Sequence, residues 1–269
     1  MKLKTISHLP VSILGLAISQ DMDVQCIPVA LAVGINYLWF YNLSAISNTV
    51  EELKRVLSDQ RQDVMIATGS ESRNFTELKT YLAQVRHQLE IEQVDIFFLE
   101  YISPTDDLTE IKTLLDELTT LKKQDLIRYL GVSTHNRELA IALIESGQID
   151  VLMHRYNMAH RQAEKQVFPT AIKTATPAIA FTCTRWGTLL KGHPQWQERI
   201  PTAADCYRYA LANEAINLAL TAPKTLAQLQ DNLQVLHHFQ LTSADKKLWQ
   251  SYGDLIYGSG QDTFETQWL

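Results

Sequence analysis

Acidic and aromatic side chains that could carry out proton transfer stand directly after short apolar segments of this sequence. Glu100 and Tyr101 follow the segment Val94–Leu99, and His135 follows a second segment of the same kind. A carboxyl group at the end of a buried strand must be ion-paired, hydrogen-bonded or protonated. If Trp39 and Tyr101 surround Glu100, loss of hydration raises its pKa and lets it donate a proton near neutral pH.

Two arginines, Arg155 and Arg185, follow later apolar segments and offer a second kind of chemistry. Their forked guanidinium groups could hold a carboxylate or a phosphate, and Trp186 could form a stacked wall of the same pocket. A structural role accounts for these residues equally well, because both arginines could neutralise Glu100 and Trp186 could only seal one end of the fold. Both interpretations stay open.

His135 could act as an acid, a base or a hydrogen-bond donor to a substrate. Its neighbours Thr134 and Asn136 are typical helix-capping residues, so the start of a helix explains the same cluster without chemistry. His154 and His160 have no cysteine or carboxylate at ligand spacing, and we therefore expect no metal site.

The composition excludes several classes of protein. Charged residues make up 20% of the 269 residues, and 10 glycines and 8 prolines are too few for a fibrous or disordered chain. A net charge of −6 argues against nucleic acid as a partner, because that binding depends on clustered Lys and Arg. Three widely spaced cysteines, Cys26, Cys183 and Cys206, form neither a disulfide framework nor a metal motif. We therefore expect a protein of the reducing cytoplasm.

The beginning of the chain contains an apolar stretch that could be mistaken for a signal peptide. His8 and Pro10 interrupt it, and we expect this stretch to supply the first strand instead. No other run approaches the roughly 20 apolar residues needed to span a bilayer, so we expect no membrane partner.

The candidate residues can meet only if a common fold aligns the segments that precede them. Short runs rich in β-branched residues alternate with stretches of helical period, a pattern typical of parallel βα units. The predicted strands are Val11–Leu16, Gly34–Trp39, Asp63–Thr68, Val94–Leu99, Tyr129–Ser133, Val151–His154, Ala178–Thr182 and Ala215–Leu220. The predicted helices include Asn48–Ser58, Phe75–Leu89, Leu108–Lys123 and Arg137–Ser146.

Eight such alternations in a chain of this length predict an α/β fold, a (β/α)8 TIM barrel that forms a single domain over residues 1–269. An open doubly wound sheet is disfavoured, because no Gly-x-Gly-x-x-Gly follows the first strand. We expect the last segment, about 241–269, to pack on the barrel. It has a helix-start signal at Thr242–Asp245 and an aromatic tail, Phe264–Trp268.

Six stretches, in order, resemble the aldo-keto reductase superfamily along nearly the whole chain. They are Gly34–Tyr37, Val64–Thr68, Val94–Leu99, Ile127–Ser133, Arg155–Asn157, and Thr221–Lys224 with Gln228 and Asn232. The resemblance implies a β/α barrel that holds NADP(H) across its strand ends and reduces a small molecule.

The resemblance also implies a set of cofactor-binding residues. Lys224, at the start of a helix, would meet a phosphate with its side chain and with unpaired backbone N–H groups. Gln228 and Asn232 match the residues that hydrogen-bond the adenine. Phe181 matches the ring on which the nicotinamide stacks, and Ser133 matches a ligand of its carboxamide.

The catalytic tetrad of the family, an Asp, a Tyr, a Lys and a His, has no match in this sequence. The Asp falls on Trp39, the Lys on Gly69 and the His on Glu100. The Tyr falls near Ser44. The resemblance therefore implies a divergent branch of the family with replaced chemistry.

The leading hypothesis is an NADP(H)-dependent oxidoreductase that reduces a carbonyl or imine, with Glu100, Tyr101 or His135 as proton donor. Tyr41 could also replace the phenolic acid, although a Tyr at such a site usually only buries its ring. One alternative is a non-redox acid–base enzyme of the isomerase or lyase type, acting on an anionic substrate. Another is a catalytically silent binding protein. The substrate and the oligomeric state stay open.

Overall fold

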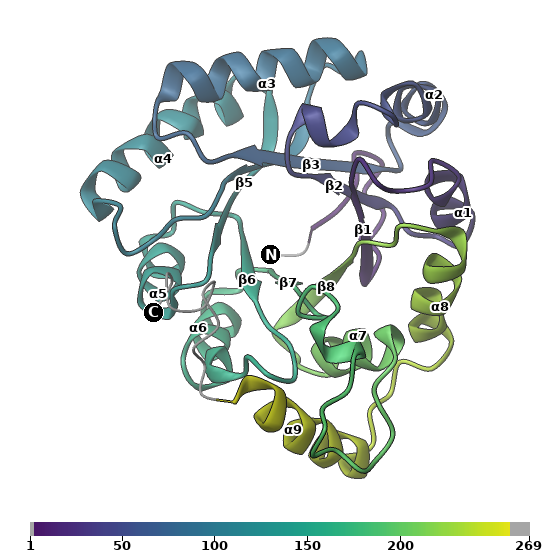
Figure 1. Ribbon diagram of the computed structural model, residues 1–269. Coiled ribbons are helices and arrows are strands. Elements are labelled where there is room, and N and C mark those ends of the chain that lie inside the picture. Colours follow the sequence, from purple (N-terminus) through teal and green to yellow (C-terminus); the bar gives the residue numbers. More distant parts are fainter. Residues whose placement is uncertain (1–2, 259–269) are drawn as a thin grey trace.

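A closed barrel of eight parallel strands forms the centre of the molecule (Figure 1). The computed structural model describes residues 3–258. Each strand pairs with the next in chain order, and β8 returns to pair with β1. The strands are β1 (Leu14–Ile18), β2 (Tyr37–Phe40), β3 (Met65–Ser70), β4 (Val94–Leu99), β5 (Ile127–Thr134), β6 (Val151–Arg155), β7 (Ala178–Phe181) and β8 (Ile216–Thr221). The predicted (β/α)8 TIM barrel is confirmed.

Helices surround the barrel and connect successive strands (Figure 1). The α-helices are α1 (Cys26–Ala32), α2 (Val50–Gln60), α3 (Phe75–Leu89), α4 (Leu108–Lys123), α5 (Arg137–Ser146), α6 (Val167–Thr174), α7 (Ala203–Leu211), α8 (Leu226–His237) and α9 (Ser243–Tyr257). Short 3-10 helices in the loops after β2, β6 and β7 are η1 (Leu43–Ile46), η2 (Gln162–Lys165) and η3 (Thr188–Leu190).

Helix caps explain where the predicted bounds agree with the structure. The helices α3, α4 and α5 have the predicted bounds, as does the strand β4. The three helices start after Asn74, Asp107 and Asn136, whose side chains accept hydrogen bonds from N–H groups of the first turn.

The first strand is the clearest difference from the prediction. β1 begins at Leu14 and not at Val11, because the residues before it turn back on themselves. Lys4 and Pro10 form an antiparallel bridge, and Leu3 packs into the interior of the barrel. The apolar stretch at the start of the chain therefore supplies both a plug for the barrel and its first strand.

The interior of the barrel is filled by side chains from alternate strand positions, because successive residues of a strand face opposite sides. This interior cluster contains the buried residues Leu3, Tyr37, Met65, Ala67, Ile96, Phe98, Val151, Met153, Ile179, Phe181, Leu218 and Leu220. The barrel is thus a packed core whose chemistry is confined to its ends.

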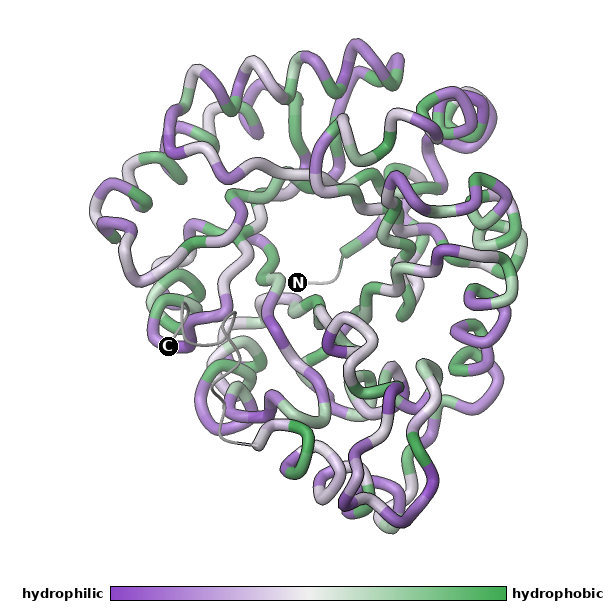
Figure 2. The backbone as a smooth tube through the Cα atoms, viewed as in Figure 1, coloured by the Kyte–Doolittle hydropathy of each residue, from purple (hydrophilic) through white to green (hydrophobic). Residues whose placement is uncertain are grey.

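The remaining strand side chains pack against the helices. In α3, for example, Leu78, Leu82, Val85 and Leu89 are buried at helical spacing. Figure 2 shows hydrophobic and hydrophilic residues alternating along these helices, as expected for elements with one covered face. No helix within residues 3–258 is long and apolar enough to cross a membrane.

The helix α9 follows the last unit of the barrel. It starts as the sequence predicts, with the Thr242 side chain accepting a hydrogen bond from the Asp245 N–H at 3.0 Å. Trp249 and Tyr252 are buried, and the Tyr252 hydroxyl donates to the Leu189 carbonyl at 2.8 Å. The predicted aromatic tail, Phe264–Trp268, lies outside the described residues.

Candidate active site

The interior rows of the barrel end in a layer of larger and more polar residues at the carboxyl ends of the strands. Trp39, Glu100, Ser133, Arg155 and Phe181 each stand two residues past an interior position of the same strand. Because strand side chains alternate, these five positions continue the inward-facing rows. We call this layer the barrel mouth, the face at which β/α barrels carry their chemistry.

Glu100 is the buried carboxyl group of the barrel mouth, with 1% of its surface exposed. Neither its Oε1 atom nor the indole Nε1 of Trp39 has a hydrogen-bond partner of acceptable geometry within the described residues. Burial raises the pKa of Glu100 well above its usual value; the charge of Glu71 adds to this, and the nearby Trp39 indole acts in the opposite direction. The acid form of Glu100 is therefore favoured well above the pH at which a solvated Glu ionises.

Gly69 makes room for the side chain of Glu100. A Cβ atom at position 69 would lie 2.7 Å from Cγ of Glu100 and 2.3 Å from the carbonyl oxygen of Phe98. Phe98 is the partner of Gly69 in the pairing of β3 with β4, so this backbone oxygen cannot easily move. Glu100 fits at this place because residue 69 has no side chain.

Aromatic rings from four strand ends meet at the barrel mouth. The ring of Tyr101 lies 6.0 Å from that of Tyr41 and 5.9 Å from that of His135. The ring of Phe181 lies 6.3 Å from Tyr101 and 5.3 Å from His135. The structure thus brings together these four predicted residues, which we call the aromatic cluster.

His135 is buried within the aromatic cluster. Burial, together with the charges of Arg155 and His154, lowers the pKa of His135 to about 3. Its imidazole is therefore neutral at pH 7, so one ring nitrogen can donate a hydrogen bond and the other can accept one.

Glu71 was missed from the sequence, although it follows β3 much as Glu100 follows β4. It is exposed and accepts a hydrogen bond from the Tyr41 hydroxyl. The pKa of Tyr41 is raised by burial and then by Glu71. The rule that chemistry follows strand ends could have found Glu71.

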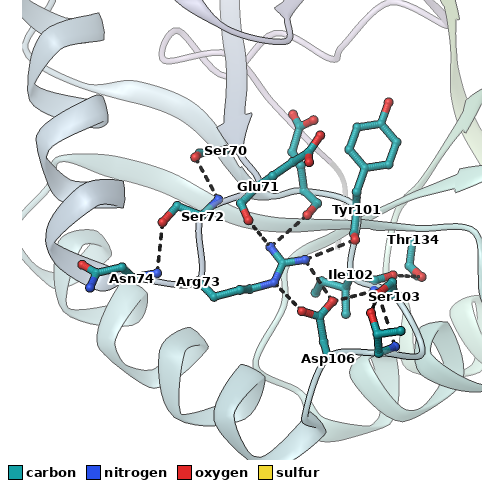
Figure 3. A network of polar contacts seen from close by, with 12 residues as sticks. Ser70, Glu71, Ser72, Arg73, Asn74, Tyr101, Ile102, Ser103, Asp106 and Thr134 are labelled. Carbon is teal, nitrogen blue, oxygen red and sulfur yellow. Dashed lines mark hydrogen bonds and ion pairs between the residues drawn. The ribbon is translucent and has the colours of Figure 1, made fainter.

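Arg73 joins the loops that follow β3 and β4 (Figure 3). Its Nη1 atom donates to the carbonyl oxygens of Glu71 and Glu100 at 2.8 and 3.1 Å. Its Nη2 atom donates to the carbonyl oxygen of Tyr101 at 3.1 Å, and the guanidinium also grips both carboxylate oxygens of Asp106 at 2.8 and 3.0 Å. Arg73 therefore fixes the backbone around Glu100, and no sequence pattern marks it.

Ser133 and Thr134 hold the loop after β4 from the other side. Ser133 Oγ accepts the Tyr101 N–H at 2.8 Å, and the Ser133 carbonyl accepts the Ile102 N–H at 2.9 Å. Thr134 Oγ1 donates to the Ile102 carbonyl at 2.6 Å. Part of the hydrogen-bonding capacity of Ser133 is thus used within the chain, and its role towards a cofactor stays a prediction.

Lys224, Gln228 and Asn232 lie where β8 leads into α8. The Lys224 N–H donates to Oε1 of Gln228 at 2.7 Å, and the Lys224 ammonium lies 2.9 Å from the Asp21 carboxylate. Asn232 is buried and donates to Thr221 Oγ1 at 2.8 Å. A cation beside a helix N-terminus suits a phosphate, so these donors fit the phosphate end of a dinucleotide. The Lys224 ammonium would then interact with both the phosphate and Asp21.

The predicted substrate-binding arginines both act on His160, because burial and then the charges of Arg155 and Arg185 lower its pKa to about 2. Arg155 lines a cavity of about 270 Å³ together with His135. Arg185 is buried and donates to the Ile256 carbonyl of α9 at 2.6 Å. Trp186 is 53% exposed, so its role as a pocket wall stays a prediction.

Comparison with known sequences points to one family. The Aldo/keto reductase family matches residues 14–199, which is more than half of the chain. The uncharacterized oxidoreductase YqkF of Bacillus subtilis (strain 168) is 20% identical over 286 residues, and the match covers 92% of each protein.

Solved structures show the same fold. The aldo-keto reductase AKR11C1 from Bacillus halodurans, in its holo form, matches with a TM-score of 0.78 and 19% identity, covering 97% of this chain and 99% of that chain. The glycerol dehydrogenase AKR11B4 from Gluconobacter oxydans matches with a TM-score of 0.73 and 18% identity, covering 91% and 92%. The family match extends from β1 to beyond η3 and so includes most of the barrel mouth. The chain therefore belongs to the aldo/keto reductase family.

Proposed function

We propose that this protein is an oxidoreductase that uses NADP(H) to reduce a carbonyl or imine group of a small molecule, with Glu100 as the proton donor. The observation that carries the proposal is the buried carboxyl group of Glu100 at the barrel mouth, where burial raises its pKa well above the usual value. Family membership supports the reductase part, as does the relative named as an oxidoreductase.

The cofactor would be held by residues from both ends of the site. Lys224 and the first turn of α8 would hold the phosphate of the adenosine half, and Gln228 and Asn232 would contact the adenine. Phe181 would stack on the nicotinamide, and Ser133 would bind its carboxamide. The bound, reduced cofactor supplies a hydride to the substrate.

Glu100 is the best acid of the three candidates. His135, with a pKa of about 3, is a neutral imidazole at neutral pH and is therefore a poor proton donor. Tyr101 holds its proton tightly, because burial above all raises its pKa, and the carboxylates of Glu100 and Glu71 raise it further when they are ionised. A carboxylic acid whose pKa is raised transfers its proton more readily than such a phenol. The Glu100 proton moves to the substrate oxygen or nitrogen, and solvent restores it afterwards.

A fluorescence titration with NADPH tests the cofactor part. We expect binding below millimolar concentration, and an affinity weakened by about tenfold in Lys224→Met, since a charge-assisted contact to phosphate is lost. Lys54→Met, on α2, is the matched control and should bind as the wild type does. Absence of binding at millimolar NADPH would end the proposal.

Trp39 favours a second candidate. Its ring packs against the interior cluster at the barrel mouth, where the family is expected to have a small Asp. Such a ring could fill the volume in which nicotinamide and substrate meet. Glu100, His135 and Arg155 would then form an acid–base site for an isomerisation or elimination on an anionic substrate. NADPH binding that is absent in the wild type and gained in Trp39→Ala would favour this candidate.

A further inference from the structure

The loops that follow β3 and β4 bring a second carboxyl group to the barrel mouth beside Glu100. Ser70 is the partner of Leu99 in the pairing of these strands, and the Glu100 N–H donates to the Ser70 carbonyl at 2.9 Å. Glu71 and Glu100 therefore each come directly after one member of the last registered pair. Neighbouring strands of a sheet lie about 4.8 Å apart, so the two residues leave the sheet side by side.

Hydrogen bonds hold Glu71 at the barrel mouth. The Nη1 atom of Arg73 donates to the carbonyl oxygens of both Glu71 and Glu100. The Glu71 carboxylate accepts a hydrogen bond from the hydroxyl of Tyr41, whose ring lies 6.0 Å from that of Tyr101. In Figure 3, the side chains of Glu71 and Tyr101 extend to the same side of their loops, opposite the guanidinium of Arg73.

The two carboxyl groups differ in their access to solvent. Only 1% of the surface of Glu100 is exposed, whereas Glu71 is an exposed residue. Burial raises the pKa of Glu100 most, and the charge of Glu71 raises it further. Interacting carboxyl groups titrate as a pair, and unlike surroundings separate the pair into a member that keeps a proton and a member that ionises.

The other ionisable groups around Glu100 do not take up a proton at neutral pH. Four are phenols whose pKa is raised, above all by burial, so that they are already protonated: Tyr37, Tyr41, Tyr81 and Tyr101. Burial, with the charge of Arg155 on β6, lowers the pKa of His135 to about 3. The charge of Arg73 is balanced by Asp106 at 2.8 Å. A proton from solvent therefore reaches Glu100 most directly through Glu71.

We propose that Glu71 and Glu100 share one proton, and that Glu71 returns a proton from solvent to Glu100 after each turnover. In the reaction, the O–H bond of Glu100 breaks as its proton goes to the substrate oxygen or nitrogen. Two adjacent carboxylates disfavour one another, so the exposed Glu71 then takes a proton from a hydronium ion or a buffer acid. The new O–H bond of Glu71 breaks as this proton passes to the Glu100 carboxylate, and both groups regain their starting state.

Glu71 thus acts through Glu100 and does not contact the substrate. Its part in turnover rests on the proposed reductase function, whereas the shared proton can be tested without any activity.

Urea unfolding of the full chain across the pH range in which it folds tests the shared proton. The difference in stability between the wild type and Glu100→Gln gives the pH at which Glu100 ionises in the folded protein. The same difference between Glu71→Gln and the double variant Glu71→Gln/Glu100→Gln gives this pH without the charge of Glu71. We expect it to be lower by about one pH unit or more, because a like charge no longer opposes ionisation.

The matched control is Glu77→Gln, which removes an equal charge from the first turn of α3 and should leave this pH unchanged. Glu71 and Glu77 are both exposed, so both variants are expected to fold. No shift in Glu71→Gln, or an equal shift in Glu77→Gln, overturns the proposal.

Rapid mixing of the protein and NADPH with excess benzaldehyde tests the return of the proton, at a pH where Glu100 of Glu71→Gln is still protonated. In this variant we expect a first turnover at the wild-type rate and later turnovers about tenfold slower or more, because only the later ones need a returned proton. Acetate buffer should restore the later turnovers by supplying a small carboxylic acid. Sodium chloride at the same ionic strength should not.

The outcomes separate the proton return from the reductase function. Equal rates for the first and later turnovers of Glu71→Gln, or no effect of acetate, overturn the return of the proton through Glu71. A lowered ionisation pH of Glu100 in Glu71→Gln without any oxidation of NADPH supports the shared proton and contradicts only the proposed reductase function.

Discussion

The pKa of Glu100 is raised because its neighbours offer the buried carboxyl group little compensation for lost hydration. Gly69 has no side chain to compete for the space, and the nearby indole of Trp39 makes no hydrogen bond of acceptable geometry with the carboxyl group. The charge of Glu71 adds to the effect of burial. At the scale of single residues, the site is therefore defined by desolvation more than by pairing.

The raised pKa of Glu100 predicts how the stability of the protein depends on pH. Between the pKa of Glu in the unfolded chain and that of Glu100, the folded protein binds more protons. This contribution to stability is present at low pH and lost as the pH rises through the folded pKa. The variant Glu100→Gln has no group that titrates at this position, so its stability does not decrease in this way. Between about pH 4.5 and the pKa of Glu100 in the folded protein, the free energy of unfolding of the variant should rise relative to the wild type by about 1.4 kcal/mol for each pH unit.

Urea unfolding of both proteins between pH 5 and pH 8 measures this difference. Glu92→Gln is the control, because the Glu92 side chain is fully exposed and its variant should follow the wild-type curve. Parallel curves for the wild type and Glu100→Gln would contradict the assignment of a protonated Glu100. In the reductase assay, the same variant should turn over about 10² to 10⁴ times more slowly, with NADPH binding retained.

Single elements of the fold could be predicted from the sequence because their signals are local. Val94–Leu99 is apolar on both faces, and α4 begins after a strong cap at Asp107. Position after a strand was enough to select Tyr101 and His135, whose rings meet at the barrel mouth. These signals arise from residues that are close together in the sequence, so one sequence is enough to detect them.

Contacts between elements could not be predicted in the same way. Arg73 donates hydrogen bonds to carbonyl groups 27 and 28 residues further along the chain, and no residue near Arg73 in the sequence indicates these contacts. The plug formed by Leu3 depends on a turn before β1 that interrupts an otherwise strand-like pattern.

The clamp formed by Arg73 predicts the behaviour of the loop after β4. Arg73→Ala removes the hydrogen bonds to this loop, in which Asp106 also accepts the Ser103 N–H at 2.7 Å. We expect amide hydrogen exchange in residues 100–107 to become about tenfold faster, because local opening then costs about 1.4 kcal/mol less.

Hydrogen exchange followed by mass spectrometry measures this change. Arg86→Ala, on α3, is the control, because Arg86 donates a hydrogen bond to the Glu92 carbonyl and not to the loop after β4. Wild-type exchange of residues 100–107 in Arg73→Ala would show that the loop is held by Ser133 and Thr134 alone.

At the scale of the whole molecule, α9 ties the loops of the last βα units together. Arg199 pairs with Asp205 of α7 and Asp245 of α9, both at 2.9 Å, and its guanidinium lies 4.2 Å from the ring of Trp249. Arg185 donates to a carbonyl near the end of α9. The helix thereby braces the loops that follow β6 and β7.

At Gly253, the helix α9 closely approaches the backbone of the loop after β6. A Cβ atom at this position would lie 1.9 Å from the Met158 carbonyl oxygen and 2.9 Å from the Ala159 nitrogen. Replacing Gly by Ala inside a helix normally stabilises a protein by about 0.5–1 kcal/mol. At Gly253 we expect the opposite sign, a loss of about 1–3 kcal/mol, because the overlap is with backbone atoms that no rotamer change can relieve.

Urea unfolding of Gly253→Ala and of Ser251→Ala, an exposed position two residues earlier on the same helix, separates packing from helix propensity. Ser251→Ala should be neutral or slightly stabilising. If Gly253→Ala is as stable as Ser251→Ala, α9 does not pack closely on the loop after β6.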